Sequence, residues 1–154
     1  SGALTYAGNW DSYQQFPHWN KLDYQGIDAY FPLSSATTPS PTELQSAWQP
    51  TKAALKAQYD SLGLPILFTE YGYRSVDNCT ARPWESSRGG TVNLSAQANA
   101  YQALFATFWQ EPWFGGGFLW KWHSPHPQAG GPSNNRCTPQ NKPAEQLVKE
   151  WYGG

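Results

Sequence analysis

The chain has 154 residues and a formal net charge of −1, and charged side chains make up 14% of it. Its length suits a single domain, and no run of about 18 apolar residues is available to span a membrane. The near-zero charge provides no positive field for a phosphate backbone, so neither a membrane nor a nucleic acid is an expected partner. Methionine is absent even from position 1, and we therefore expect the chain to be part of a longer product.

Aromatic residues make up 16% of the chain, and nine of them are tryptophans. A small core does not need so many indole rings. Flat apolar rings that line a groove are typical of sites for sugars, whose ring faces are also flat and apolar. The composition therefore favours a carbohydrate ligand.

Four short apolar runs bounded by turn residues predict strands. These runs cover residues 4–8, 25–31, 64–70 and 116–122. Helical patterns lie between and after the strands. We expect a short irregular helix broken at Pro17 within 11–22, and longer helices over 40–62, after the cap candidate Ser95, and over 143–152.

The helix between the second and third strands has the clearest boundaries. Ser40 is placed to cap it, Pro41 suits its first position, and Glu43 completes a capping box. Gly63 should end it. Pro50 falls inside and removes one hydrogen bond while clashing with the preceding turn, so we expect a kink or two shorter helices.

The alternation of strands and helices predicts an α/β fold with a parallel sheet of right-handed βαβ units. The strands read as apolar on both faces, which is typical of such sheets. Two polar segments, 74–94 and 123–142, follow the third and fourth strands. Both are too long for simple connections, so we expect them to be functional loops.

Active sites of parallel α/β folds lie at the carboxyl ends of the strands. Glu70 is the only glutamate that ends a predicted strand. It shares the two-residue spacing of Ile66 and Phe68, so all three side chains are expected on one face, with Glu70 at the mouth of the site. The alternative is a structural ion pair between Glu70 and Lys121 or Arg74.

Asp28 is the second carboxylate near a strand end. It shares the spacing of Tyr30 and could contact a substrate, support the site, or form a structural hydrogen bond to a neighbouring strand. The histidines and cysteines show no metal-ligand spacing, and no nucleophile elbow or phosphate-binding loop occurs. We therefore expect no metal, no other cofactor and no acyl transfer.

A strand-end glutamate among tryptophans and tyrosines suits the nucleophile of a glycoside hydrolase, because a carboxylate stabilises the oxocarbenium-like transition state. Retaining enzymes of this class also need a second carboxyl group about 5 to 5.5 Å away. Only Asp28 offers one at another predicted strand end. The catalytic pair is therefore incomplete on this chain.

The strand-end motifs together form a recognisable series. They are Ala7-Gly8-Asn9-Trp10, Gly26-Ile27-Asp28-Ala29-Tyr30-Phe31-Pro32, Pro65-Ile66-Leu67-Phe68-Thr69-Glu70-Tyr71-Gly72-Tyr73 and Gly117-Phe118-Leu119-Trp120-Lys121-Trp122-His123. This series resembles the last four strands of a clan A glycoside hydrolase, most closely family 113, the β-mannanase-like group. The resemblance covers nearly the whole chain. It implies a (β/α)8 TIM barrel of which residues 1–154 form the carboxyl-terminal half-barrel.

The resemblance also implies roles for single residues. Glu70, in the Phe-Thr-Glu-Tyr-Gly motif, matches the catalytic nucleophile, and Tyr30 is similar to the tyrosine that orients it. Trp120 and Trp122 resemble the tryptophan platform beneath the sugar in the −1 subsite, and Trp10 is a further platform. The remaining expected substrate contacts are Asn9, Asp28, Tyr71 and His123.

In the family that the chain resembles, the acid/base glutamate ends the fourth strand, whereas this chain begins at the fifth. The resemblance therefore implies that the amino-terminal half-barrel, or a second copy of the chain, supplies the rest. We expect a retaining glycoside hydrolase for a β-linked, mannan-like glycan, with little or no activity from this chain alone. The alternatives are a carbohydrate-binding or scaffold half-barrel without activity, and a fragment whose aromatic residues form only barrel core.

Cys79 and Cys137 lie in polar loop sequence. They are candidates for a disulfide between the two long loops, or for two unpaired thiols. Glycosylation sequons at Asn78 and Asn93 add support for export. We therefore expect a secreted or periplasmic protein.

Overall fold

The computed structural model describes residues 2–87 and 89–153, and a parallel four-stranded sheet lies at its centre. The strands lie side by side in chain order, and each neighbouring pair is parallel. The expected α/β class with a parallel sheet is confirmed. The strands are β1 (Ala7–Asn9), β2 (Gln25–Asp28), β3 (Ile66–Tyr71) and β4 (Phe114–Leu119).

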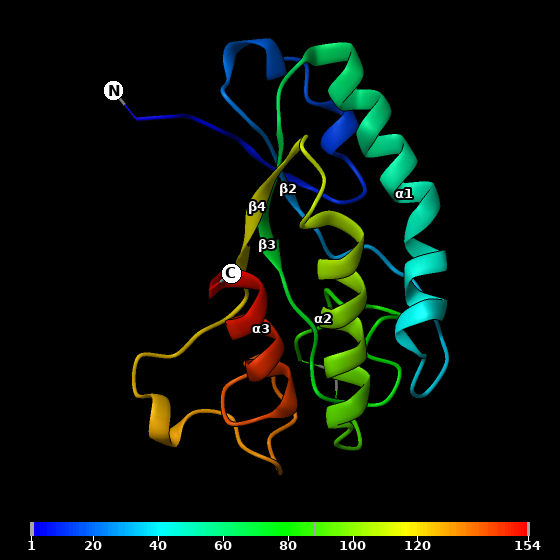
Figure 1. The fold of residues 1–154 in the computed structure, drawn as a ribbon, viewed down its shortest axis with the longest axis vertical. Helices are drawn as coiled ribbons and strands as arrows, with labels where there is room; N and C mark the ends of the chain where they lie inside the picture. The colour runs from blue at the N-terminus through cyan, green and yellow to red at the C-terminus, as the bar shows by residue number, and fades with distance from the viewer. Residues whose placement is uncertain (1, 88, 154) are drawn as a thin grey trace.

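The described residues form three α-helices beside the sheet, and Figure 1 shows α1 and α2 on the same side of it, with α3 beside α2. In the described ranges, no helix is long and apolar enough to cross a membrane. The α-helices are α1 (Pro41–Leu62), α2 (Leu94–Phe108) and α3 (Pro143–Gly153). Short 3₁₀ turns are η1 (Tyr13–Gln15), η2 (Trp19–Lys21) and η3 (His126–Gln128). The expected irregular helix around Pro17 thus consists of η1 and η2.

Local sequence sets both ends of α1. Ser40 Oγ accepts a hydrogen bond from Glu43 N at 3.2 Å, and Glu43 Oε2 accepts one from Ser40 N at 2.7 Å. Gly63 ends the helix at φ +67, in the left-handed conformation that glycine adopts without steric cost. The predicted capping box and stop are confirmed.

Pro50 does not divide α1, which is one helix of 22 residues. Of the two expected outcomes, two shorter helices is therefore wrong, and a kink at Pro50 stays a prediction. Trp48 and Leu55, before and after the proline, are both fully buried. Packing on both sides therefore holds the helix together and offsets the hydrogen bond that the proline lacks.

The start of α2 differs from the prediction. Asn93, not Ser95, is the N-cap, because Asn93 Oδ1 accepts a hydrogen bond from Ala96 N at 2.9 Å. Asn93 Nδ2 also donates to Thr38 Oγ1 at 2.7 Å and to Asp77 Oδ1 at 2.8 Å. The cap therefore links α2 to two loops, which Ser95, exposed in the first turn, does not.

The core lies between the sheet and the helices. Phe68 of β3 is fully buried, and its ring centroid lies 6.5 Å from that of Trp48 on α1 and 5.1 Å from that of Phe108 on α2. The predicted apolar stripe of α2 faces this core: Tyr101, Leu104, Phe105 and Phe108 are buried, and Ala98 is partly buried.

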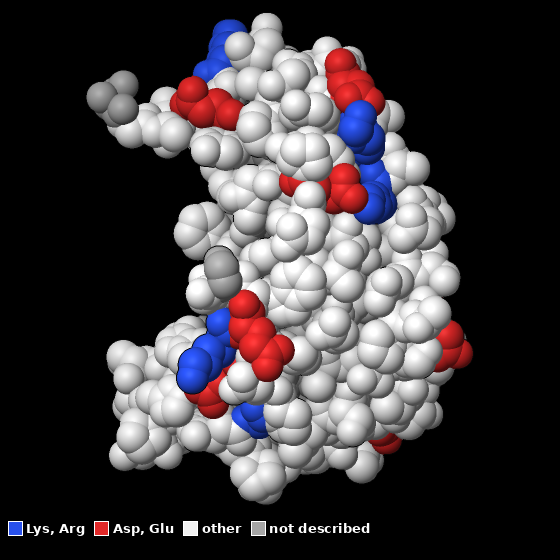
Figure 2. All heavy atoms as spheres, viewed as in Figure 1, with Lys and Arg blue, Asp and Glu red and all other residues white. Residues whose placement is uncertain are grey.

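The other face of the sheet has no helix over it in Figure 1, and Figure 2 shows the molecule hollowed on that side. Phe118 of β4 is 64% exposed. At the edge, β1 is only three residues long and exposes both of its ends, so the expectation of strands buried on both faces does not hold there. The sheet is thus closed on its helix side and open on the other.

Candidate active site

Glu70 lies one residue before the end of β3, at the carboxyl edge of the sheet. Tyr30, just beyond β2, donates a hydrogen bond from its hydroxyl to Glu70 Oε2 at 2.8 Å. Burial, together with this bond to a carboxylate, raises the pKa of Tyr30 far above its ordinary value. Tyr30 therefore stays protonated and donates to Glu70 at any physiological pH.

The alternative of a structural ion pair is not realised. In the part of the chain that the structure describes, Glu70 forms no ion pair with Lys121 or Arg74. Tyr30 is instead the side-chain partner of Glu70. The carboxylate is thus held by a neutral donor.

Glu70 does not share a face with Ile66 and Phe68, so that expectation is wrong. Ile66, Phe68 and Tyr71 are the fully buried positions of β3, which means that the spacing changes from two residues to three. Phe68 and Glu70, two apart on β3, pair with consecutive residues of β2, as in a β-bulge. The extra residue turns Glu70 away from the helix-side core.

Asp28 pairs with Glu70 in the sheet register, and its Oδ1 accepts a hydrogen bond from Thr69 Oγ1 at 2.8 Å. The cross-strand hydrogen bond considered for Asp28 is therefore confirmed. Asp28 is half-buried and lies at the same edge as Glu70. Its role as a substrate contact stays a prediction.

An aromatic pair lies beyond β1. Trp10 stacks on Trp84, with ring centroids 5.0 Å apart and an angle of 22° between the planes. Trp84 is 42% exposed and comes from the long loop after β3. Trp84 is not among the residues predicted from the sequence, although its loop is one of the two expected to be functional. Asn9, the last residue of β1, is exposed, and its Nδ2 donates to Asp11 Oδ1 at 2.7 Å.

Trp120 and Trp122 lie in the loop after β4, because that strand ends at Leu119 and not at 122 as expected. Their exposed fractions are 43% and 49%, so both rings are available to a ligand. Lys121 Nζ lies 5.7 Å from the centroid of the Trp120 ring. Exposed rings at the carboxyl edge are in keeping with the expected sugar platforms.

Tyr71 cannot serve as a substrate contact in this structure, which corrects the expectation. Its side chain is fully buried on the helix side, against Tyr101 and Phe105 of α2. Its hydroxyl lies 2.7 Å from that of Tyr152. The same bulge that turns Glu70 away from this core places Tyr71 in it.

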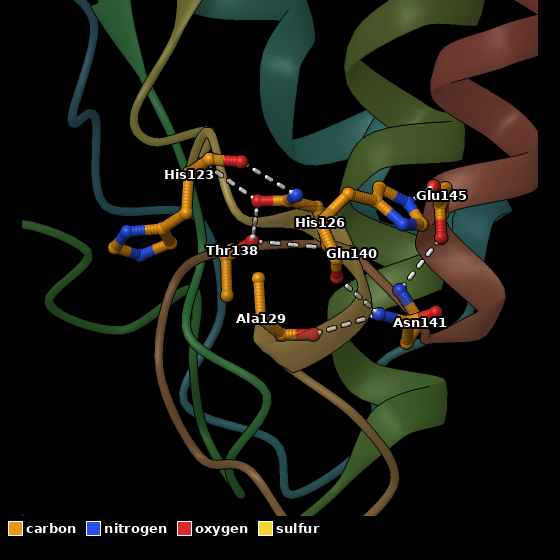
Figure 3. A network of polar contacts seen from close by, with 7 residues as sticks. All are labelled: His123, His126, Ala129, Thr138, Gln140, Asn141 and Glu145. Atoms are coloured by element: carbon orange, nitrogen blue, oxygen red, sulfur yellow. Dashed lines mark hydrogen bonds and ion pairs between the residues drawn. The ribbon is translucent and has the colours of Figure 1, made fainter.

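The long loop after β4 is held by the buried side-chain amide of Gln140 (Figure 3). Gln140 Oε1 accepts hydrogen bonds from His123 N at 2.6 Å and from Thr138 Oγ1 at 2.9 Å, while Gln140 Nε2 donates to His123 O at 2.9 Å. These bonds fix the His123 backbone and leave its ring free of them. The predicted contact of His123 with substrate stays a prediction.

The end of the same loop is tied to α3. Asn141 N and the ring of His126 both donate to the carboxylate of Glu145, and Asn141 Nδ2 donates to Ala129 O at 2.9 Å. Burial raises the pKa of Glu145, but the hydrogen bonds outweigh it, so the pKa lies below its ordinary value. The loop is therefore anchored to the helix beneath it.

The two cysteines are free thiols, so the disulfide considered for them is not formed. Burial raises the pKa of Cys79 to about 12 and raises that of Cys137 as well.

The asparagine side chains of both sequons form hydrogen bonds. Asn78 Nδ2 donates to Ser35 O at 2.5 Å, and Asn93 Nδ2 donates to Thr38 and Asp77, as described above. The expected export stays a prediction.

The described residues include no group of three His, Cys, Asp or Glu side chains placed to hold a metal ion.

The chemistry open to the site depends on the Glu70 carboxylate. A carboxylate held by a neutral hydroxyl, as Glu70 is by Tyr30, can act as a nucleophile or accept hydrogen bonds from a ligand. General acid catalysis needs another proton donor, and the described carboxylate nearest in register, Asp28, is already bonded to Thr69.

Comparison with known proteins gives a clear match. The model of Glycoside Hydrolase Family 113 matches residues 1–138. A search of curated proteins finds no significant match. Among solved structures, the GH113 β-mannanase AaManA from Alicyclobacillus acidocaldarius, in complex with ManMIm, is 27% identical with a TM-score of 0.81. The match covers 99% of this chain and 46% of the mannanase.

Two further structures share the fold. A GH113 β-1,4-mannanase is 24% identical with a TM-score of 0.82, over 99% of this chain and 46% of its own. A β-glucuronidase from Bifidobacterium dentium, complexed with coumarin-3-O-glucuronide, is 20% identical with a TM-score of 0.61, over 98% and 24%. The chain thus spans less than half the length of the solved proteins that it matches.

Proposed function

We infer the function of this chain from one premise: it belongs to Glycoside Hydrolase Family 113. We propose that it forms the carboxyl-terminal half of a (β/α)8 barrel that hydrolyses a β-linked, mannan-like glycan with retention of configuration. Glu70 is the nucleophile and Tyr30 positions it. The acid/base glutamate comes from outside this chain.

The hydrogen bond from Tyr30 to Glu70 is the observation that carries the proposal. It aims a carboxylate at the carboxyl edge of a parallel sheet, where enzymes of this architecture work. One oxygen of Glu70 is held by the tyrosine, and the other is not bonded to any described side chain. That second oxygen is placed to attack.

The proposed reaction has two steps. A carboxylate oxygen of Glu70 bonds to the anomeric carbon as the glycosidic bond breaks, and the external acid protonates the departing oxygen. Water, deprotonated by the same external group, then attacks the anomeric carbon and releases Glu70. The exposed rings of Trp120 and Trp122 offer stacking surfaces for the sugar.

The missing half of the site explains why we propose a partner. The sheet has four strands, and its open face and both edges need closure that four further βα units supply. The coverage of 46% of the matched mannanases agrees with half of a barrel. The partner is the amino-terminal half-barrel, or a second copy of this chain that closes the barrel without an acid/base.

The test uses the chain joined to, or co-expressed with, an amino-terminal half-barrel of the same family. Glu70→Gln should abolish hydrolysis of β-1,4-mannan and keep binding of mannohexaose, whereas Glu85→Gln, in the loop after β3, should retain turnover. A 2-fluoro mannoside inactivator should label Glu70. Labelling of another residue, or full turnover by Glu70→Gln, would refute the assignment.

A carbohydrate-binding half-barrel without activity is the second candidate. The shortage of carboxylates favours it, because Asp28, the other described carboxylate at this edge, is engaged with Thr69. The completed barrel would then bind mannohexaose but show no turnover for Glu70→Gln to remove. A failure to bind any glycan would instead leave the aromatic residues as barrel core.

A further inference from the structure

A cavity of about 400 Å³ lies at the carboxyl edge, beside the loop after β4. Three of its lining residues are cationic: Arg74, Lys121 and Arg136. None of its described lining residues is acidic, although the whole chain has slightly more acidic than basic residues. We call it the basic cavity. Its volume lies in the range of small-molecule sites.

Arg74 is the least expected of the three cations, because it is 5% exposed. Its Nε donates to Asn135 O at 3.1 Å, and its two terminal nitrogens make no hydrogen bond with the described residues. Buried guanidinium groups are ordinarily paired with an anion, because removing an unpaired charge from water is costly. Among the described residues, no carboxylate forms an ion pair with Arg74.

The other two cations, too, form no ion pair with any described residue. These are Lys121 and Arg136, which are both exposed. The three cations come from three parts of the chain, so only the folded loops bring them together. No described carboxylate forms an ion pair with any of the three, although Arg74 also lines a neighbouring cavity that includes Asp77 and Glu85.

The basic cavity adjoins the candidate active site. Trp120, one of the expected sugar platforms, lines it, and Lys121 Nζ lies 5.7 Å from the Trp120 ring centroid. Cys137 also lines it, and Cys137 is close enough to Tyr30 to contribute, after burial and Glu70, to the raised pKa of that hydroxyl. A glycan stacked on Trp120 would therefore carry its substituents towards the cations.

We propose that the basic cavity is a subsite for a negatively charged group on the glycan, either the carboxylate of a uronic acid or a sulfate ester. This inference rests on the proposed function and specifies its substrate as an acidic glycan. The free nitrogens of Arg74 form a planar fork that suits two oxygens of such a group. Lys121 and Arg136 add charge at the entrance.

The first experiment uses calorimetry to measure binding of three probes to the completed barrel, in which this chain carries Glu70→Gln so that no probe is hydrolysed. The probes are neutral β-1,4-mannohexaose, a β-1,4-linked hexamannuronate and a sulfated mannohexaose. The acidic probes should bind about tenfold more tightly than the neutral one at low salt, as expected for one charge-assisted contact. Added salt should reduce this preference. Whichever acidic probe binds more tightly identifies the charged group.

Variants then locate the binding. Lys121→Gln and Arg136→Gln, both at exposed positions, should each reduce the preference for acidic probes several-fold and leave mannohexaose binding unchanged. Arg82→Gln is the matched control, since it removes a nearby exposed arginine outside the basic cavity and should change nothing. Arg74→Lys keeps the charge but removes the fork, so it should weaken acidic binding while circular dichroism shows the fold intact.

The outcomes separate this inference from the proposed function. Equal binding of neutral and acidic probes, or equal effects of Arg82→Gln and Arg136→Gln, would overturn the inference. Binding of none of the probes would overturn it too. The proposed function is judged separately, by whether turnover of the completed barrel depends on Glu70.

Discussion

At the scale of single residues, the candidate site depends on where one carboxylate points. Glu70 is placed by a bulge in β3 and held by the hydroxyl of Tyr30 at 2.8 Å. Both β2, which pairs with the bulge, and Tyr30 are distant from Glu70 in sequence. The proposed nucleophile is thus an ordinary strand-end glutamate that tertiary packing orients.

Tyr30→Phe tests the positioning role. It removes the hydrogen bond to Glu70 and keeps the ring, so kcat of the completed enzyme should fall about tenfold to a hundredfold while KM changes little. Steady-state kinetics on β-1,4-mannan measures both constants. Tyr24→Phe serves as the control variant. An unchanged kcat would show that Glu70 needs no positioning by Tyr30.

Thiol reactivity tests the state of the two cysteines. Because burial raises the pKa of Cys79 to about 12, Cys79 should resist alkylation by iodoacetamide at pH 9 in the native chain and react in denaturant. Mass spectrometry counts the labels. An unreduced sample that stays unlabelled in denaturant would contain a disulfide, contrary to the structure.

The same raised pKa makes stability depend on pH. Between the ordinary thiol pKa and about 12, the folded chain keeps a proton that the unfolded chain has lost, so the free energy of unfolding falls as pH rises through this window. Cys79→Ala should show a smaller fall than the original chain. Urea unfolding at several pH values measures the difference, and parallel curves would contradict it.

At the scale of elements, the helices keep their predicted places, but their boundaries depend on partners. Ser40 and Glu43 cap α1 through groups three residues apart, so the pattern is readable in the sequence. The cap of α2 is Asn93 and not Ser95, and the amide of Asn93 also reaches Asp77 and Thr38. Asp77 and Thr38 lie in two loops from other parts of the fold.

Asn93→Ala should therefore destabilise the chain by about 2 kcal/mol, from the lost cap and the lost loop contacts. Ser95→Ala should change the free energy of unfolding by less than about 0.5 kcal/mol, because Ser95 is exposed and caps nothing. Both variants destroy the same Asn-Leu-Ser sequon, so glycosylation cannot account for a difference. Equal losses in the free energy of unfolding, measured with urea, would argue against Asn93 as the cap of α2.

At the scale of the whole molecule, the two faces of the sheet differ in how they are covered. The helices cover one side of the sheet, whereas the outer edges of β1 and β4 have no strand partner among the described residues. Phe118, Trp120 and Trp122 are exposed on or beyond β4. Unpaired edges and exposed apolar side chains both favour association.

The isolated chain should therefore self-associate at micromolar concentration, and adding the amino-terminal half-barrel should convert it into a one-to-one complex. Sedimentation velocity distinguishes these states. As a control, the completed barrel should remain a single species over the same concentration range. A stable, well-folded monomer of the chain alone would show that the open face needs no partner.

The sequence by itself determined the features that depend on neighbours along the chain. The capping box of α1, the order of strands and helices, and the place of Glu70 at a strand end follow from signals a few residues apart. Such signals act through local hydrogen bonds and side-chain periodicity, so they are readable without a fold.

Only the tertiary structure decided which side chains meet. The bulge that turns Glu70 outward and buries Tyr71 arises from pairing with two neighbouring strands. The stack of Trp84 on Trp10 and the gathering of the cations in the basic cavity join segments that lie far apart in sequence. Such contacts depend on how helices and loops pack around the sheet, which no short pattern encodes.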